Sequence, residues 1–130
     1  MIYFSNRTNE ANYVKVHKSG TGCWSGIGMS GGEQLLSLDD GCWSRGTVIH
    51  EFIHAFGFHH EQSRPDRDEY VEIIWDNIRP EYQNQFDIAF GTNTYGVPYD
   101  PNSVMHYGNS NFGNGGGFTM ISKVRRICIE

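Results

Sequence analysis

Three histidines in one short stretch have the spacing of a metal site. Residues 50–60 read HEFIHAFGFHH, so His50 and His54 are four positions apart. In an α-helix, residues at this spacing project from the same face one turn apart, where two imidazoles can bind one ion. Gly57 permits a sharp reversal of the chain, after which His60 can offer a third nitrogen at about 2.0 to 2.1 Å from zinc. The spacing therefore predicts a zinc site held by these three histidines.

The donor set is that of a catalytic zinc site. Such sites have three protein ligands and an open position for water, whereas structural sites close all four positions and usually employ Cys thiolates. Glu51 directly follows the first histidine. It is not needed as a ligand, so its carboxylate can take a proton from the water that the metal activates. A histidine in an apolar helix can also be a plain core residue, and HExxH alone occurs by chance, but the longer pattern is much more specific.

A second segment, residues 103–107, reads SVMHY. Taken alone it is consistent with an ordinary loop that contains a buried methionine, Met105. The motif HExxHxxGxxH followed by a later Met-containing turn is, however, the signature of metzincin peptidases. His17 and His59 lie off the motif and are expected at the surface, and the role of His106 depends on what surrounds it.

The helix that must position the first two histidines is predicted from Thr47 to Phe56. Ser44 is a suitable N-cap, and Gly57 sits where a left-handed turn commonly ends a helix. Apolar residues cover most of the helical surface, so we expect the helix to be buried. They are Val48, Phe52 and Ala55 on one face, with Ile49, Ile53 and Phe56 beside them.

The remaining elements are predicted to be short. Residues 12–18 alternate with a period of two and predict a half-buried strand, and 23–29 and 33–38 predict two short strands of the same small sheet.

After the helix, the charged stretch 61–69 predicts an ordered loop and 70–75 a short strand or turn. Aromatic residues at four-residue spacing predict a second helix over 79–90. From Gly91 onward, Gly, Asn and Pro favour extended loop.

The composition is that of one globular domain. The chain has 130 residues, 38% of them hydrophobic, which is enough for a core and too few for the usual division into domains. The net charge of −5 and the lack of a Lys/Arg cluster argue against nucleic acid or an anionic membrane surface as partner. No run approaches the roughly 18 apolar residues of a spanning helix, and the first residues lack the apolar stretch of a signal peptide.

The three cysteines leave two interpretations open. Cys23 and Cys42 lie in glycine-rich, turn-prone sequence, while Cys128 stands near the end. A bridge between the first two would stabilise a small domain in an oxidising compartment. The alternative is three reduced thiols.

The sequence resembles the astacin family of secreted zinc endopeptidases over about residues 3–123. The similarity covers HEFIHAFGFHHEQSRPDRDEYVEIIWDNI, which looks like the active-site segment of that family, and VPYDPNSVMHYGNSNF, which looks like its Met-turn region. It also covers SGTGCWSGIG and GCWSRGTVIH, which resemble the approach to the helix. The resemblance implies an α+β, metzincin-like catalytic domain with a small twisted sheet, an active-site helix and one zinc ion in a cleft.

The resemblance also implies roles for single residues. It makes His50, His54 and His60 the zinc ligands, Glu51 the general base and Met105 the structural residue beneath the metal. Tyr107 matches the family's tyrosine that binds zinc through its hydroxyl at rest and then stabilises the tetrahedral intermediate. Further matches are Trp24, on the edge strand that binds extended substrates, the disulfide pair Cys23 and Cys42, and Glu61, the acidic residue that pairs with the N-terminus released on propeptide removal.

These matches predict a secreted, zinc-dependent endopeptidase that hydrolyses internal bonds of protein or peptide substrates with metal-activated water. We expect one partial peptidase domain over residues 1–130 that lacks N- and C-terminal elements of the family, with 124–130 as a tail off the family pattern. The alternative is an inactive fragment that binds zinc weakly or serves only as an interaction module. The sequence leaves the natural substrate and the oligomeric state open.

Overall fold

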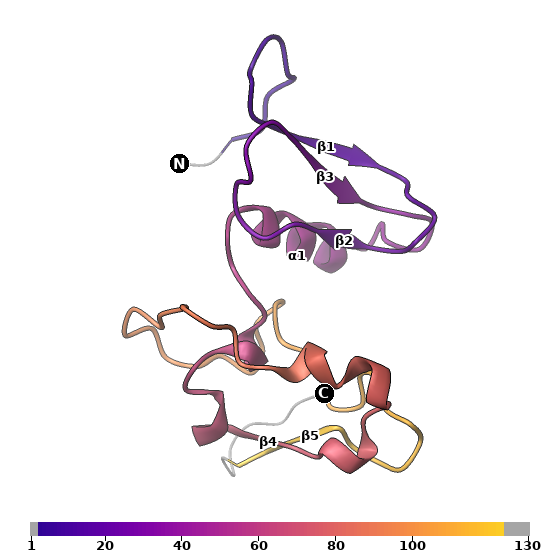
Figure 1. The fold of residues 1–130 in the computed structure, drawn as a ribbon, viewed down its shortest axis with the longest axis vertical. Coiled ribbons are helices and arrows are strands. Elements are labelled where there is room, and N and C mark those ends of the chain that lie inside the picture. The colour runs from indigo at the N-terminus through magenta and orange to yellow at the C-terminus, as the bar shows by residue number, and fades with distance from the viewer. Residues whose placement is uncertain (1–2, 124–130) are drawn as a thin grey trace. The chain divides into compact units, whose positions relative to one another are not determined.

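The computed structural model describes residues 3–123 and divides after Phe58 into two compact units (Figure 1). Each unit is built around its own buried cluster of apolar side chains. That residues 1–130 form a single domain stays a prediction. The tail 124–130, with Cys128, lies outside the described residues.

The first unit contains a three-stranded sheet. Its strands are β1 (Tyr13–His17), β2 (Trp24–Ser25) and β3 (Glu33–Ser37), in the spatial order β1-β3-β2. β1 runs parallel to β3, with Tyr13 opposite Glu33, and β2 runs antiparallel to β3. β2 is therefore an edge strand of this sheet.

The predicted strands 12–18 and 33–38 are confirmed, but 23–29 is a strand only at Trp24–Ser25. Gly28 adopts φ +72°, which is outside the extended range, so a strand cannot continue through this residue to 29. The prediction that strand 12–18 is half-buried is wrong for its apolar residues. Val14 and Val16 were expected to be buried, but they are 39% and 47% exposed. The helix of this unit packs against β2 and β3 instead.

That helix is α1 (Arg45–Ala55), which begins two residues before the predicted Thr47 and ends one residue before the predicted Phe56. The predicted N-cap Ser44 and the predicted turn at Gly57 are confirmed. The Ser44 Oγ accepts a hydrogen bond from the Thr47 N–H at 3.0 Å, which satisfies one of the unpaired donors of the first turn. At the other end Gly57 has φ +102°, and its N–H donates to the His54 carbonyl at 2.8 Å. A residue with a Cβ would be strained there.

The expectation that the whole helix is buried is wrong. Its apolar contact is one face, where Val48 and Phe52 pack on a buried cluster of Leu36, Leu38 and Cys42. Ile49 is 45% exposed, and the two buried residues of the helix are both polar, Glu51 and His54. Burial in this helix thus follows the residues predicted for chemistry more than the hydrophobic pattern.

The second unit has little regular structure. A two-stranded antiparallel sheet pairs β4 (Val71–Ile73) with β5 (Met120–Ser122). Four short 3₁₀ helices precede or follow β4: η1 (Glu61–Ser63), η2 (Arg67–Glu69), η3 (Trp75–Asn77) and η4 (Pro80–Phe86). The buried cluster of this unit consists of Val71, Ile73, Ile78, Phe86, Tyr99 and Met120.

The predicted helix over 79–90 is wrong in type and length, since the structure has a 3₁₀ helix that ends at Phe86. Phe86 is fully buried, whereas Phe90 is fully exposed, so no continuous apolar face supports a longer helix. The strand or turn predicted over 70–75 is confirmed as β4 followed by η3. The three residues of β5 were expected as loop, because so short a strand has no detectable period.

Within residues 3–123, no helix has both the length and the apolar character needed to cross a membrane.

A disulfide joins Cys23 to Cys42 across a sequence separation of 19 residues. This confirms the bridge and excludes the alternative in which both thiols are reduced. The bond links the start of β2 to the chain that leads into α1, and Cys42 is buried beside Leu36 and Leu38.

Replacing both cysteines by alanine should lower the free energy of unfolding by about 3 kcal/mol, because the bridge restricts the unfolded chain. Urea denaturation of the protein measures this difference. Reduction with dithiothreitol should destabilise the wild type similarly and leave the double variant unaffected. Equal stability of the two proteins would mean that the bridge does not hold this unit together.

Candidate metal centre

The three histidines predicted from spacing form a group that could hold one metal ion. His50 and His54 lie one turn apart on α1, with ring centroids 4.7 Å apart. One ligand nitrogen of each of His50, His54 and His60 lies within 4.8 Å of the others. Among the described residues, this is the one group of three or more possible metal ligands.

The backbone at the end of α1 orients His54. The Nδ1 of its ring lies 2.8 Å from the Phe58 carbonyl oxygen. A carbonyl only accepts, so Nδ1 carries the proton and Nε2 keeps its lone pair for a metal. Bonds of this kind from the second ring nitrogen typically fix the tautomer and the ring direction of metal-binding histidines. The His54 carbonyl is itself held by the N–H groups of Gly28 and Gly57 at 2.9 and 2.8 Å.

Glu51 is 5% exposed, and its Oε2 is buried without a hydrogen-bond partner among the described residues. Burial raises the pKa of its carboxyl above the ordinary value, while the nearby His50 partly opposes this by lowering it. Buried polar atoms are nearly always hydrogen-bonded, so a carboxylate oxygen left without a partner near His50 is suited to an occupant of the site such as water. The three imidazoles and this acceptor fit a zinc ion with an open position for water.

In the second unit, the segment that contains Met105 and Tyr107 lies against the residues around His60. The Glu61 N–H donates to the Met105 carbonyl at 2.9 Å, and the Tyr107 N–H donates to the Gln62 Oε1 at 3.1 Å. The rings of His60 and Tyr107 are 4.4 Å apart between centroids. Met105 is buried, as predicted for a structural methionine.

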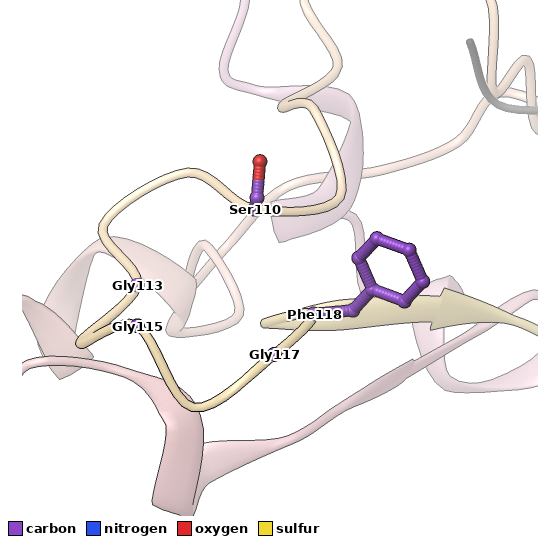
Figure 2. Close-up of a pocket in the computed structure, with 5 residues that line it drawn as sticks. All are labelled: Ser110, Gly113, Gly115, Gly117 and Phe118. Atoms are coloured by element: carbon purple, nitrogen blue, oxygen red, sulfur yellow. The ribbon is translucent and has the colours of Figure 1, made fainter.

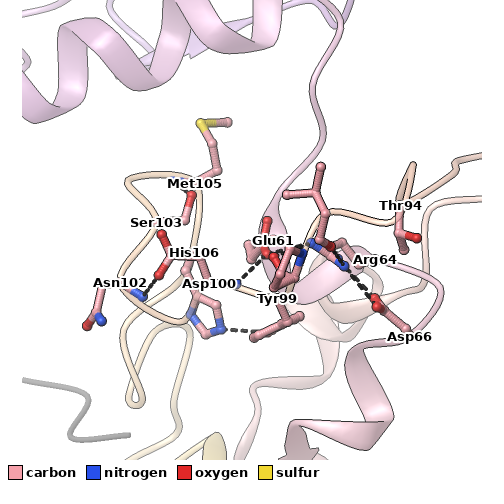
Figure 3. A network of polar contacts seen from close by, with 12 residues as sticks. Glu61, Arg64, Asp66, Thr94, Tyr99, Asp100, Asn102, Ser103, Met105 and His106 are labelled. Atoms are coloured by element: carbon pink, nitrogen blue, oxygen red, sulfur yellow. Dashed lines mark hydrogen bonds and ion pairs between the residues drawn. The ribbon is translucent and has the colours of Figure 1, made fainter.

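Glu61 has partners within the described chain. Its Oε1 accepts from the Arg64 Nη1 at 3.0 Å and from the Asp100 N–H at 2.8 Å. Figure 3 shows these residues and their contacts. Arg64 also pairs with Asp66, which lowers the pKa of the Asp66 carboxyl and raises that of the guanidinium. This charged cluster ties the loop around residue 100 to the chain that follows His60.

The other residues singled out in the sequence lie elsewhere. Trp24 is 37% exposed on the edge strand β2, and its indole N–H donates to the Thr21 Oγ1 at 2.9 Å. His59 is exposed, as expected. His17 is partly buried, with its ring 5.8 Å from that of Trp24, so its assignment to the surface is wrong in part. It packs against the indole instead of pointing into solvent.

Sequence reasoning missed two residues that contact the Met105 segment. Tyr99 hydrogen-bonds His106 through its hydroxyl at 2.6 Å, and Gln62, which is fully buried, holds the Tyr107 backbone. A tyrosine in a loop and a glutamine in a charged stretch have no periodic signal. The SVMHY motif at residues 103–107 was the one sequence signal that indicated a functional role near these residues.

The second unit also has an open hollow of about 420 Å³, lined by Ser110, Gly113, Gly115, Gly117 and Phe118 (Figure 2). None of the residues predicted for catalysis or metal binding lines it. It carries no group that could act as an acid, base or metal ligand, so we assign it no role.

Comparison with known proteins places these features in one family. The family model for the astacin peptidases matches residues 1–129. The mouse protein "Meprin A subunit beta" is 46% identical over 126 residues, which cover 95% of this chain and 18% of that protein. "Zinc metalloproteinase nas-15" of Caenorhabditis elegans is 46% identical over 116 residues, covering 88% and 20%.

A solved structure is also similar, that of High choriolytic enzyme 1, described as a hatching enzyme zinc-protease from Oryzias latipes. The TM-score is 0.90 at 41% identity, with 97% of this chain and 64% of that chain covered. This match confirms the expected α+β, metzincin-like fold class. The family relationship confirms that zinc is the metal that the three-histidine group is positioned to bind.

Replacing His54 by alanine should weaken zinc binding by at least about a hundredfold, since loss of a supporting residue alone costs ten- to a hundredfold. Competition with a chromophoric chelator measures the affinity. The wild-type affinity should also fall as the pH is lowered, because imidazole ligands must lose their protons to bind.

The matched control is His59→Ala, which removes an exposed imidazole that is not in the group. It should bind zinc as the wild type does. Equal losses in the two variants would reject the assignment of the site.

Proposed function

The chain belongs to the astacin family of peptidases, and on that basis we propose that it forms the catalytic part of a zinc-dependent endopeptidase that cleaves internal bonds of extended protein substrates. The observation that carries the proposal is the histidine group, whose ligand nitrogens lie within 4.8 Å of one another, together with the Glu51 carboxylate oxygen that has no partner among the described residues. The chain spans 18 to 20% of the length of the two relatives named above, so the activity of the whole protein is part of the proposal.

In this proposal His50, His54 and His60 hold zinc, which when bound acidifies a water molecule and polarises the substrate carbonyl. Glu51 is the general base that takes the proton of the attacking water and later passes it to the leaving amine. Its burial supports this role, because a carboxylate removed from bulk water is a stronger proton acceptor. The absence of a competing hydrogen bond to Oε2 within residues 3–123 supports it too.

Tyr107 is the proposed partner of the oxyanion that forms when the peptide carbonyl is attacked. Its ring contacts that of His60, and its backbone is held at the N–H by Gln62. A fixed backbone limits the positions that the hydroxyl can reach, which favours a well-aligned hydrogen bond to the oxyanion. Met105, buried two residues before it, is the proposed packing residue beneath the metal.

Trp24 is the proposed contact for substrate. It lies on β2, which pairs with β3 on one side and is an edge strand of the three-stranded sheet. An extended peptide can add to such an edge through main-chain hydrogen bonds, with side chains such as the exposed indole contributing to selectivity. This geometry suits internal segments of a protein chain better than its termini.

We further propose that the protein is secreted. The Cys23–Cys42 bridge supports this, because such bonds persist in oxidising compartments.

The variant Glu51→Gln keeps the size of the side chain but cannot accept a proton, so it should retain zinc and lose about a hundred- to ten-thousandfold in kcat/KM. Cleavage of an internally quenched peptide gives the rate, and metal analysis gives the zinc content. Glu72→Gln, the same change at an exposed position of β4, is the control and should leave both unchanged. Substantial activity in Glu51→Gln would remove this residue from the mechanism.

The variant Tyr107→Phe should keep zinc and KM but lose about a hundred- to a thousandfold in kcat, the usual cost of removing one oxyanion donor. Tyr82→Phe, which removes a hydroxyl elsewhere in the same unit, should behave as the wild type. Steady-state kinetics on the quenched peptide separates kcat from KM. An unchanged kcat in Tyr107→Phe would exclude the oxyanion role.

A further inference from the structure

Buried Tyr99 and partly buried His106 form a hydrogen-bonded chain that ends on the backbone of Tyr107. The Tyr99 hydroxyl lies 2.6 Å from the His106 Nε2 (Figure 3). The other ring nitrogen of His106, Nδ1, lies 2.7 Å from the Tyr107 carbonyl oxygen. Tyr99 is 8% exposed, so water does not compete freely for its hydroxyl.

The direction of these bonds follows from what each group can do. The Tyr107 carbonyl only accepts, so the His106 Nδ1 carries the proton and donates. In a neutral imidazole, Nε2 is then an acceptor, and the Tyr99 hydroxyl donates to it. Burial lowers the pKa of His106 and raises that of Tyr99, which favours the neutral form of both groups. The chain therefore runs from Tyr99 through His106 to Tyr107 with every donor matched to an acceptor.

The N–H of Tyr107 is held as well. It donates to the Oε1 of Gln62 at 3.1 Å, and Gln62 is fully buried. The ring of Tyr107 packs near Phe86 and Phe112, at centroid distances of 5.7 and 5.4 Å. Backbone and ring are thus both constrained.

Tyr99 has its own support. Its ring stacks on that of Tyr70 with centroids 4.6 Å apart and planes 7° from parallel. The Arg64 guanidinium lies 5.4 Å from the ring centroid and donates to the carbonyls of Val97 and Pro98 at 2.8 and 3.2 Å. The loop before Tyr99 is therefore fixed to the charged cluster around Glu61, which makes the hydroxyl of Tyr99 a firm anchor point.

We propose that Tyr99 and His106 are positioning residues for Tyr107, and that the Tyr99 hydroxyl fixes the backbone from which the Tyr107 phenol reaches the reacting carbonyl. This inference rests on the proposed function, in which Tyr107 stabilises the oxyanion. Neither Tyr99 nor His106 touches substrate in this role. Their effect passes through the Tyr107 carbonyl.

The first test removes one oxygen atom, in Tyr99→Phe. The ring stack on Tyr70 is preserved, zinc content should be unchanged, and kcat should fall about tenfold at constant KM, as expected for one lost hydrogen bond. The matched control is Tyr70→Phe, which keeps the same ring stack and removes a hydroxyl outside the chain from Tyr99 to Tyr107, so this variant should keep the wild-type kcat. Equal kcat values in the two variants would overturn the proposal.

A double-mutant cycle distinguishes positioning from a general structural effect. If Tyr99 acts through Tyr107, then Tyr99→Phe should cause no further loss of kcat in a Tyr107→Phe background. Independent, multiplicative losses would mean that Tyr99 supports the protein by another route and would refute the inference.

Hydrogen exchange of the Tyr107 amide gives a readout that needs no activity. Loss of the Tyr99 hydroxyl should accelerate its exchange by about tenfold, since His106 then holds the neighbouring Tyr107 carbonyl less firmly and the local backbone opens more easily, whereas Tyr70→Phe should not. Unchanged protection in Tyr99→Phe would contradict the positioning role. A wild type that shows this exchange pattern but cleaves no peptide would reject the proposed function and leave Tyr99 as a support of the Tyr107 backbone.

Discussion

The end of α1 is the constraint on which the candidate metal centre depends. The His54 carbonyl accepts from both Gly57 and Gly28, and the His54 ring donates to the Phe58 carbonyl, so one residue is held by its backbone and its side chain at once. Gly28 and Gly57 are neighbours, and a Cβ on either would lie in ordinary contact with the Cα of the other, at 3.7 Å. The positive φ of both residues makes any side chain there unfavourable. The direction in which the chain leaves the helix is thereby set.

The burial of polar side chains in α1 lowers the stability of the folded chain. Glu51 and His54 are its buried side chains, while Ile49 and Phe56 are exposed. A carboxylate oxygen buried without a hydrogen bond is unfavourable by itself, and proteins commonly accept such costs where chemistry requires them. The disulfide and the apolar face formed by Val48 and Phe52 provide compensating stability in the same unit.

The second unit consists mainly of long irregular segments, which are held in place by side-chain contacts. Hydrogen bonds from charged side chains to backbone carbonyls take the place of sheet and helix ladders. Arg64 binds the carbonyls of Val97 and Pro98, and Arg67, which is 5% exposed, binds those of Gln62 and Phe86 at 3.1 and 2.7 Å. A guanidinium suits this work because its five donors lie in a rigid plane and remain charged. Gln62, whose carbonyl Arg67 binds, in turn accepts from the Tyr107 N–H, so these contacts also help to fix the segment that contains Met105.

The sequence by itself determined the parts of this protein that obey local geometry. The four-residue spacing of His50 and His54, the Ser44 cap and the glycine after the helix follow from the dimensions of an α-helix, and the histidine group was predictable from them. Tertiary structure alone decided which polar groups surround Tyr107: Gln62 reaches it from 45 positions away along the chain. Contacts of that kind depend on the path of irregular loops, which leave no period in the sequence. For the same reason the exposure of Ile49, the short β5 strand and the anchoring of Tyr99 could be found only in the folded chain.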